Sequence, residues 1–278
     1  GICGAACSLA WSGNSNNINK ISHTWELIGY REKSNWGEKR DISAESVNKV
    51  SDLKGVFSCI DLDGKIAMVP NSPCPVLWGF RGTEDSILID NFHNLGPEKP
   101  VRWLLYRTNQ ATDDHLRSKE ILNVKEGDCI RAEVVVSSIP ETIEGGHRFF
   151  RVKDHFDKSI KCAAFEPSKD FRHIIDKLVI GDKLIICGSV NNGTLNLEKI
   201  RILELVTRYS KPPNPMCECG KRTHSSGKNS YYRCKACGKK YSRPEMIAFE
   251  SELELGWYEP PASSRRHLST PASMMLKL

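Results

Sequence analysis

The first 118 residues alternate short apolar runs with turn residues and amphipathic stretches. Three runs rich in branched and aromatic residues predict strands, at 24–31, 75–80 and 101–107. The pattern also predicts a helix over 43–51 and a second helix after Thr83, whose hydroxyl is suited to an N-cap. Residues 56–60 and 65–69 flank the turn sequence DLDG and predict a hairpin. Strands with helices between them indicate a ferredoxin-like α/β sandwich.

A second pattern, with a period of two, runs from 119 to 206. Its clearest part is a half-buried strand in which every second residue is apolar and faces inward, while the residues between them face outward. The inward-facing residues are Ile130, Ala132, Val134 and Val136. Four further strands are expected at 149–153, 160–164, 183–190 and 194–205. Ser168 is suited to cap a helix that precedes the last two strands, with the apolar face Phe171, Ile174, Ile175 and Leu178. Three strands, a helix and two strands are the order of an OB-fold β-barrel, and another small barrel with a plugging helix is the alternative.

Four cysteines near the C-terminus form two closely spaced pairs, Cys217-Glu218-Cys219 and Cys234-Lys235-Ala236-Cys237. Four thiolates in two pairs suit tetrahedral Zn²⁺ in a closed structural site, so we expect all four cysteines to be ligands. The first pair has one intervening residue where two are usual. Two unrelated cysteine pairs are the alternative. A segment of this size hardly buries a core, so the metal is expected to supply its folding energy.

These patterns divide an α+β multidomain chain into a ferredoxin-like domain at 1–118, an OB-fold domain at 119–206, a zinc ribbon at 207–247 and a C-terminal tail at 248–278. Hydrophobic residues make up 39% and charged residues 27% of the 278 residues, which is typical of a soluble globular protein. The sequence has no run of about eighteen apolar residues, so no membrane partner is expected. The other seven of the eleven cysteines are scattered through apolar segments, which fits free thiols in a reducing cytoplasm.

Positive charge is concentrated at the C-terminal end. Residues 206–278 hold 13 Lys and Arg against 6 Asp and Glu, whereas residues 1–205 hold 27 against 28. Cations bind phosphates and aromatic rings stack on bases, so a basic ribbon beside a barrel predicts nucleic-acid contact; a solvated zinc module is the alternative. The candidate contact residues are His147, Arg151, Lys161, Lys228, Tyr232, Arg233, Lys235, Lys239, Lys240, Arg265 and Arg266. Of Phe149 and Phe150, one must face the barrel interior, so at most one is a stacking platform.

Eight strings lie in order along almost the whole chain: TWELIGYR (24–31), PNSPCPVL (70–77), GFRG (79–82), RTNQATDDHL (107–116), EGGH (144–147), CAAFEP (162–167), LEKI (197–200) and PPASSRRHL (260–268). Together they resemble the archaeal isoleucine-tRNA agmatidine synthases. The resemblance implies a kinase-like domain, a ferredoxin-like domain, an OB domain and a zinc ribbon. It also implies an ATP-dependent ligase that joins agmatine to C2 of the wobble cytidine in the CAU anticodon of an isoleucine tRNA. ATP activates the cytidine carbonyl oxygen, and the amine of agmatine then displaces phosphate.

The family's first domain carries an Asp-rich ATP and Mg²⁺ motif resembling G-I-D-D-T-D-S. Neither that motif nor a Gly-rich phosphate loop is found in this sequence. We therefore expect the C-terminal part of such an enzyme, without the kinase-like domain and inactive alone. Zinc is expected as a structural ion, and ATP and Mg²⁺ only in the full-length enzyme. Two alternatives remain: a split enzyme whose first domain is a separate chain, and a non-enzymatic single-stranded nucleic-acid-binding protein of OB plus zinc-ribbon type.

Agmatine joins a guanidinium to an amine, so it requires carboxylates, carbonyl oxygens and an aromatic wall. The resemblance implies a pocket where the ferredoxin-like domain faces the kinase-like domain. The candidate substrate residues are Asn71, Ser72, Cys74, Arg81, Asp113 and His115. The alternatives are a helix cap or surface acid for Asp113, a structural role for His115 and packing for Cys74. No residue of this chain is expected to be catalytic.

Overall fold

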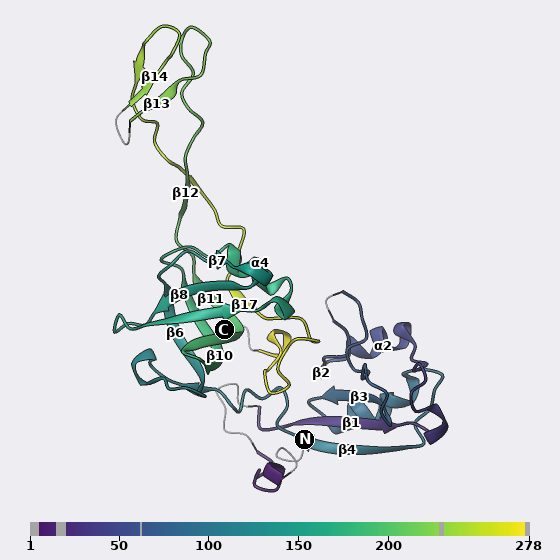
Figure 1. Cartoon of the computed structure of the whole chain (residues 1–278). Helices are drawn as coiled ribbons and strands as arrows, with labels where there is room; N and C mark the ends of the chain where they lie inside the picture. Colours follow the sequence, from purple (N-terminus) through teal and green to yellow (C-terminus); the bar gives the residue numbers. More distant parts are fainter. Residues whose placement is uncertain (1–5, 15–20, 62, 228–230, 276–278) are drawn as a thin grey trace. The chain divides into compact units, whose positions relative to one another are not determined.

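A computed structural model describes residues 6–14, 21–61, 63–227 and 231–275. The chain forms two compact units (Figure 1). Unit 1 combines Gly1–Glu204 with Leu255–Leu278, and unit 2 is Leu205–Glu254. Unit 2 is therefore inserted in the sequence between two parts of unit 1.

Within the described segments, no helix is long and apolar enough to cross a membrane.

The first part of unit 1, here called the α+β lobe, is a four-stranded antiparallel sheet with two helices (Figure 1). Its strands are β1 (Thr24–Tyr30), β2 (Val56–Phe57), β3 (Val76–Gly82) and β4 (Arg102–Thr108), in the order β2-β3-β1-β4. The helices are α2 (Ala44–Ser51) and α3 (Asp85–Asn91). Leu27, Phe80 and Leu88 are fully buried and belong to one core, so β1, β3 and α3 pack together. The element order is β-α-β-β-α-β.

The ends of these elements depart from the sequence predictions in two places. Ser43 caps α2 as its position suggests, because its hydroxyl oxygen accepts a hydrogen bond from Ser46 N at 3.2 Å. Thr83 is not the cap of α3: Glu84 takes that position, and the Thr83 amide donates to Gly55 O instead. The predicted hairpin is formed only in part: Ile60 and Ile66 make one isolated antiparallel bridge and the Asp61 amide donates to Lys65 O, whereas β2 pairs with β3. The Thr83 prediction was wrong, because the tertiary contact with Gly55 outweighed the local preference.

The second part of unit 1 is a mostly antiparallel barrel (Figure 1). Its strands are β5 (Arg117–Ser118), β6 (Cys129–Val136), β7 (Glu141–Thr142), β8 (Arg148–Lys153), β9 (Ser159–Ala164), β10 (Lys183–Asn191), β11 (Thr194–Glu204) and β17 (Gly256–Tyr258). They follow the order β5-β6-β10-β11-β9-β8-β7, with β17 beside β11. A further pairing of β6 with β8 closes the sheet on itself, and β9 pairs with β11 in parallel.

Helix α4 (Phe171–Asp176) buries Phe171 and Ile175 against this barrel, as the apolar spacing predicts. Its start differs from the prediction. Asp170 is the N-cap residue, and the Ser168 hydroxyl donates to Phe165 O at 2.6 Å within a preceding short turn. Phe150 faces the interior and is 2% exposed, so Phe149 is the outward-facing member of the aromatic pair.

Unit 2 contains two small sheets (Figure 1). One pairs β12 (Arg208–Ser210) with β16 (Ile247–Phe249), so the incoming and outgoing chains run side by side. The other is β13 (His224–Ser226), β14 (Tyr231–Arg233) and β15 (Lys240–Tyr241). Its described residues bury few apolar side chains besides Tyr232, Cys217 and Cys234, which leaves this unit dependent on the cysteine cluster.

Candidate functional sites

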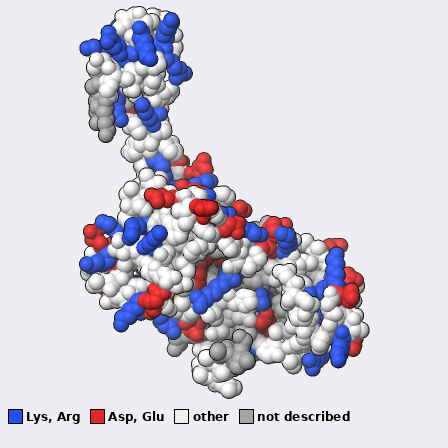
Figure 2. Space-filling view, in the orientation of Figure 1, with Lys and Arg blue, Asp and Glu red and all other residues white. Residues whose placement is uncertain are grey.

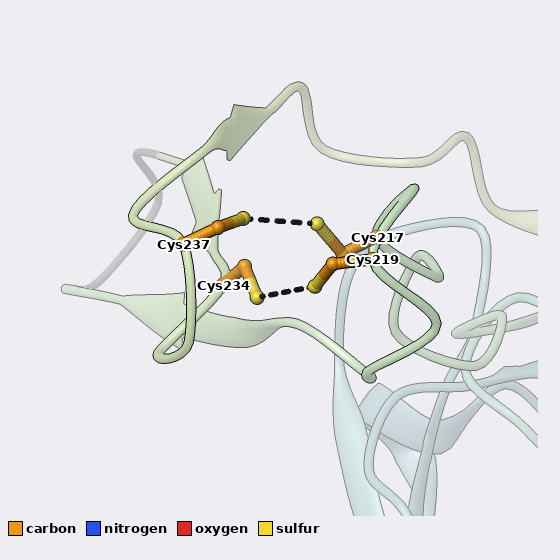
Figure 3. Close-up of side chains that lie close together, drawn as sticks. All are labelled: Cys217, Cys219, Cys234 and Cys237. Atoms are coloured by element: carbon orange, nitrogen blue, oxygen red, sulfur yellow. Dashed lines mark hydrogen bonds between the residues drawn. The ribbon is translucent and has the colours of Figure 1, made fainter.

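The four C-terminal cysteines converge at one point of unit 2 (Figure 3). Their sulfur atoms all lie within 4.8 Å of one another. The Sγ atoms of Cys217 and Cys237 are 3.3 Å apart, and those of Cys219 and Cys234 are 3.5 Å apart. A tetrahedral zinc with Zn–S bonds of about 2.3 Å requires sulfur separations of about 3.8 Å, so small adjustments fit the ion. All four positions are filled by protein sulfur, which makes the site structural.

Local backbone turns bring each cysteine pair into place despite the short first spacing. The Gly220 amide donates to Cys217 O and the Gly238 amide donates to Cys234 O. Both glycines have positive φ, 78° and 75°, which allows the chain to turn back toward the sulfurs. The Tyr241 hydroxyl donates to Cys217 Sγ at 3.2 Å and is the main reason that the pKa of this thiol is lowered to about 6. A thiolate is therefore favoured where a metal ligand requires one.

The β14–β15 pair of unit 2 exposes two positive charges, on Arg233 and Lys240, that have no acidic partner among the described residues. Arg233 and Lys240 are directly opposite each other in the antiparallel register, although like charges at such positions repel. Lys240 Nζ lies 4.7 Å from the centre of the Tyr231 ring. Lys and Arg side chains cover much of the visible face of this unit (Figure 2). An anion bound here would relieve the repulsion, which phosphate groups of a nucleic acid do well.

The other predicted contact residues of unit 2 differ in their surroundings. Lys235 is exposed, and Lys239 is exposed but forms an ion pair of 2.5 Å with Glu218. Tyr232 is 4% exposed and packs inside the unit, so its ring is not a surface platform. Lys228 lies outside the described residues.

On the barrel, the predicted contact residues surround one outward-facing aromatic ring. Lys161 Nζ lies 4.0 Å from the centre of the Phe149 ring. Phe165, 39% exposed, packs edge-on against Phe149 and against His147. Arg151 is directly opposite Lys161 in the β8–β9 register, and both are exposed. Cations beside exposed rings are the combination that single-stranded nucleic acids require.

The two C-terminal arginines each have an acidic partner, and only Arg265 is largely enclosed, since the Arg266 side chain is 42% exposed. Arg265 Nη1 pairs with Glu259 at 2.5 Å, and its Nη2 donates to Ser58 Oγ at 2.8 Å. Arg266 Nη1 pairs with Glu198 at 3.0 Å. Each of these two guanidinium groups therefore has one acidic partner within unit 1.

A cavity of about 670 Å³ in unit 1 lies between the α+β lobe and residues 262–269. Glu26 of β1, only 8% exposed, lines it and accepts hydrogen bonds from Arg81 Nε at 2.8 Å and Gln110 Nε2 at 2.6 Å. Asp61, 7% exposed, adds a second carboxylate. The Ser269 hydroxyl also lines the cavity and is buried without a hydrogen-bond partner among the described residues. The cavity therefore offers carboxylate and hydroxyl oxygens to a polar ligand.

The structure separates the six predicted substrate residues into two groups. Asn71 and Arg81 line the cavity, and Ser72 and Cys74 lie in the same exposed loop as Asn71. Arg40 holds that loop by donating to the carbonyl oxygens of residues 70, 72, 74 and 76.

Asp113 and His115 form a separate group. The Asp113 carboxylate is buried against Lys199, and His115 Nε2 lies 2.8 Å from Glu198 Oε2. Glu26, Asp61 and Ser269 were missed by sequence reasoning. Glu26 was identifiable only as an acid in an otherwise apolar strand.

Two family models match the chain: TiaS FLD domain at residues 1–115 and TiaS C-terminal zinc ribbon domain at 214–253. The curated tRNA(Ile2) 2-agmatinylcytidine synthetase TiaS of Methanosarcina acetivorans is 41% identical over 277 residues, which are 98% of this chain and 64% of the relative. The protein of the same name from Methanocaldococcus jannaschii is 39% identical over 261 residues, 91% of this chain and 61% of the relative. The chain thus spans about three fifths of the length of these relatives.

Solved structures are similar as well. A TiaS–tRNA(Ile2)–ATP complex matches with a TM-score of 0.79 and 37% identity, over 92% of this chain and 61% of the other. A TiaS–tRNA(Ile2)–AMPCPP–agmatine complex matches with a TM-score of 0.75 and 34% identity, over 92% and 61%. The similarity therefore covers both sequence and fold.

Proposed function

We propose, because the chain belongs to the TiaS family, that it is the tRNA-holding part of a tRNA(Ile2) 2-agmatinylcytidine synthetase. Such a ligase uses ATP to attach agmatine to C2 of the wobble cytidine of an isoleucine tRNA with a CAU anticodon. The observation that carries the proposal is the four-cysteine, cation-rich ribbon in a chain of which 98% aligns with a TiaS relative. A general single-strand-binding protein is not favoured, because the match extends through the α+β lobe.

We propose that the α+β lobe is the ferredoxin-like domain and the barrel the OB-fold domain expected from the sequence, with boundaries near 118 and 206. The β-α-β-β-α-β order and the sheet order β2-β3-β1-β4 support the first assignment. The closed sheet with α4 between β9 and β10 supports the second. Residues 207–247 are then the ribbon, and the remaining residues form the tail.

We propose two RNA-contacting surfaces, one on each unit. The first comprises Arg233, Lys235, Lys239 and Lys240 of unit 2, with Lys228 as a further candidate. The second comprises His147, Arg151 and Lys161 around Phe149 on the barrel. Exposed like charges in direct cross-strand register support both, because phosphates neutralise such charges and the released counterions favour binding.

We propose that agmatine binds in the cavity of unit 1, where Asn71 and Arg81 meet Glu26 and Asp61. Its guanidinium and ammonium groups require carboxylates in a partly desolvated site, and both acids are nearly buried. Arg81 then orients Glu26, while Ser72 and Cys74 belong to the loop at the cavity edge. For Asp113 and His115, the buried partners described above support a positioning role.

We propose that residues 1–278 alone hold the tRNA without modifying it, and that ATP with Mg²⁺ is bound by the part of the enzyme that this chain does not match. The sequence has no Asp-rich or Gly-rich phosphate motif, which supports the proposal. The test incubates the chain, tRNA(Ile2), ATP and labelled agmatine, with and without the unmatched part of a full-length relative as a separate polypeptide. Labelled tRNA only in the second mixture is expected. Labelling in the first mixture would overturn this division of roles.

We propose a cytoplasmic location, because the substrate is a tRNA. The cysteines outside the ribbon are consistent with a reducing compartment, since the described ones are free. Burial raises the pKa of the Cys59 and Cys187 thiols to about 12, so they behave as apolar packing groups.

A further inference from the structure

The C-terminal segment, defined here as residues 255–275, contacts both parts of unit 1. Its strand β17 extends the barrel by pairing with β11, with Trp257 opposite Arg201. Farther along, His267 O and Leu268 O accept hydrogen bonds of 2.8 Å from the backbone amides of Ala111 and Asp113. Residues 109–114 form the turn that directly follows β4 of the α+β lobe. One segment therefore connects a barrel strand to the end of the lobe's sheet.

A buried charge pair lies where these three pieces meet. Lys199 of β11 is 0% exposed, and its Nζ donates to both carboxylate oxygens of Asp113, at 2.8 and 2.7 Å, and to Thr270 O at 2.8 Å. Asp113 Oδ1 also accepts from Thr270 N at 2.7 Å. The ammonium thus uses three donors on one acid and one carbonyl oxygen. We call Lys199, Asp113 and Thr270 the lysine cluster.

The turn that carries Asp113 adopts an unusual backbone. Ala111 and Asp113 have φ of 54° and 59°, values that residues other than glycine rarely adopt. Such conformations persist where surrounding contacts determine them. Here the Thr270 hydroxyl donates to Ala111 O at 2.8 Å, in addition to the backbone bonds from the turn. The turn is shaped to receive the C-terminal segment.

A second set of polar contacts lies on neighbouring residues. Glu198, next to Lys199, accepts hydrogen bonds from His115 Nε2 at 2.8 Å and from Arg266 Nη1 at 3.0 Å. The barrel strand, the turn and the C-terminal segment are therefore joined twice, by two consecutive residues of β11.

We propose that the C-terminal segment is a clasp that fixes the α+β lobe to the barrel, and that Lys199 and Asp113 are positioning residues for tRNA modification. A buried pair costs much desolvation energy and is favourable in one arrangement only, so it selects one orientation of the two lobes. The barrel carries a proposed RNA-contacting surface and the α+β lobe lines the proposed agmatine cavity. A fixed orientation of the lobe and the barrel therefore keeps the bound RNA at a constant position relative to the cavity. The role of the clasp in tRNA modification rests on the proposed function, whereas the clasp itself does not.

The test compares hydrogen exchange of the full chain with that of four variants. Lys199→Met removes the ammonium group that bonds to the buried Asp113 carboxylate, and Asp113→Asn removes the carboxylate charge that faces Lys199. In both, amide exchange at 111–116 and 265–275 is expected to rise at least tenfold, while exchange of β13–β15 and zinc content stay unchanged. Asparagine tolerates the positive φ of position 113, so that backbone is kept. Lys183→Met is the matched control, because Lys183 lies on the neighbouring strand in an exposed pair with Glu204.

The double variant Lys199→Met/Asp113→Asn removes both charges. It is expected to recover most of the lost protection, a rescue that a purely packing role of Lys199 does not predict. Exchange at 265–275 unchanged in a folded Lys199→Met protein, or a double variant no better protected than the singles, would overturn the clasp. If Lys199→Met fails to fold, Asp113→Asn and the double variant decide in the same way.

A binding measurement separates this inference from the proposed function. Lys199→Met is expected to weaken tRNA binding several-fold with an unchanged salt dependence, because no phosphate contact is lost. Absence of tRNA binding by the unmodified chain would count against the proposed function, and the exchange data would still judge the clasp. Unchanged tRNA affinity in a variant with an opened clasp would overturn the positioning role.

Discussion

Replacing Arg233, Lys235 and Lys240 together by alanine removes three exposed positive charges from unit 2. None of the three has an acidic partner among the described residues, whereas Lys239 is paired with Glu218. Arg233 and Lys240 also repel each other across the β14–β15 pair, so their removal relieves a repulsion that offsets the loss of the cation–π contact between Lys240 and Tyr231. The variant is therefore expected to keep its zinc and its fold while losing phosphate contacts.

The size of the effect follows from counterion release. Each lost phosphate contact lowers the slope of log affinity against log salt by about 0.7–0.9, so three contacts lower it by about 2–3. Over a fourfold range of salt concentration, that difference corresponds to about a thirtyfold smaller change in affinity. The loss is largest at low salt, where counterion release contributes most.

The assay is filter binding of isoleucine tRNA over a salt series, with zinc content measured for every protein. Lys239→Ala is the matched control: it also removes one lysine of the ribbon, but one already neutralised by Glu218. Its slope is expected to change less than that of Lys240→Ala. An unchanged slope in the zinc-loaded triple variant would refute the reasoning, because it would place the phosphates elsewhere.

Three further predictions concern other parts of the chain. Cys234→Ser is expected to release zinc and unfold unit 2 alone, seen as lost zinc and lost protection of β13–β15; retained zinc would contradict the ligand assignment. Glu26→Gln is expected to weaken agmatine binding about tenfold in calorimetry, since one charge-assisted contact is lost, and unchanged affinity would exclude the cavity. Burial on its own raises the pKa of Glu198, but the hydrogen bonds and charges of His115 and Arg266 together outweigh burial. The net pKa of Glu198 is therefore lower than its ordinary value of 4.5. Its stabilising contribution is thus present above about pH 4.5 and lost as pH falls through the folded-state pKa, so Glu198→Gln should flatten the acid side of a urea-unfolding pH series.

The strands were largely predictable, because a sheet with one buried face imposes period two on the sequence. Ile130, Val134 and Val136 are buried in β6 as their alternation predicts, and Phe150 faces inward while Phe149 faces outward. The convergence of the four cysteines was predictable for a related reason: two close thiol pairs together match the tetrahedral coordination of one zinc ion. The alternation of apolar residues and the spacing of cysteines both involve residues close together in the chain, so both can be recognised in a single sequence.

Helix starts and cavity walls were less predictable, because they depend on contacts far along the chain. Thr83 suits an N-cap, yet its amide donates to Gly55 O of a distant part of the chain. Ser168 also suits an N-cap, but its hydroxyl donates to Phe165 O in the preceding turn, a local bond that competes with capping. The place of Glu26 in the cavity wall could not be predicted, because its hydrogen-bond partners Arg81 and Gln110 lie 55 and 84 residues away in the sequence.

The C-terminal segment is the largest difference between expectation and structure. The adjacent arginines Arg265 and Arg266 suggested RNA contact from the sequence. In the fold, Arg265 pairs with Glu259 and Arg266 pairs with Glu198. Asp113 resembles a surface acid in the sequence, but in the fold its carboxylate is buried and bonds to Lys199 and to the Thr270 amide. Such long-range pairs leave no periodic signal in one sequence.

The central claim is that this chain holds an isoleucine tRNA for agmatine attachment. The most direct measurement compares its affinity for isoleucine tRNA with a CAU anticodon, for a methionine elongator tRNA and for a poly-U strand, over a salt series. We predict tighter binding of the isoleucine tRNA at every salt concentration, with a steep salt dependence for all three ligands. Equal affinity for the three would contradict the claim and favour a general single-strand-binding protein.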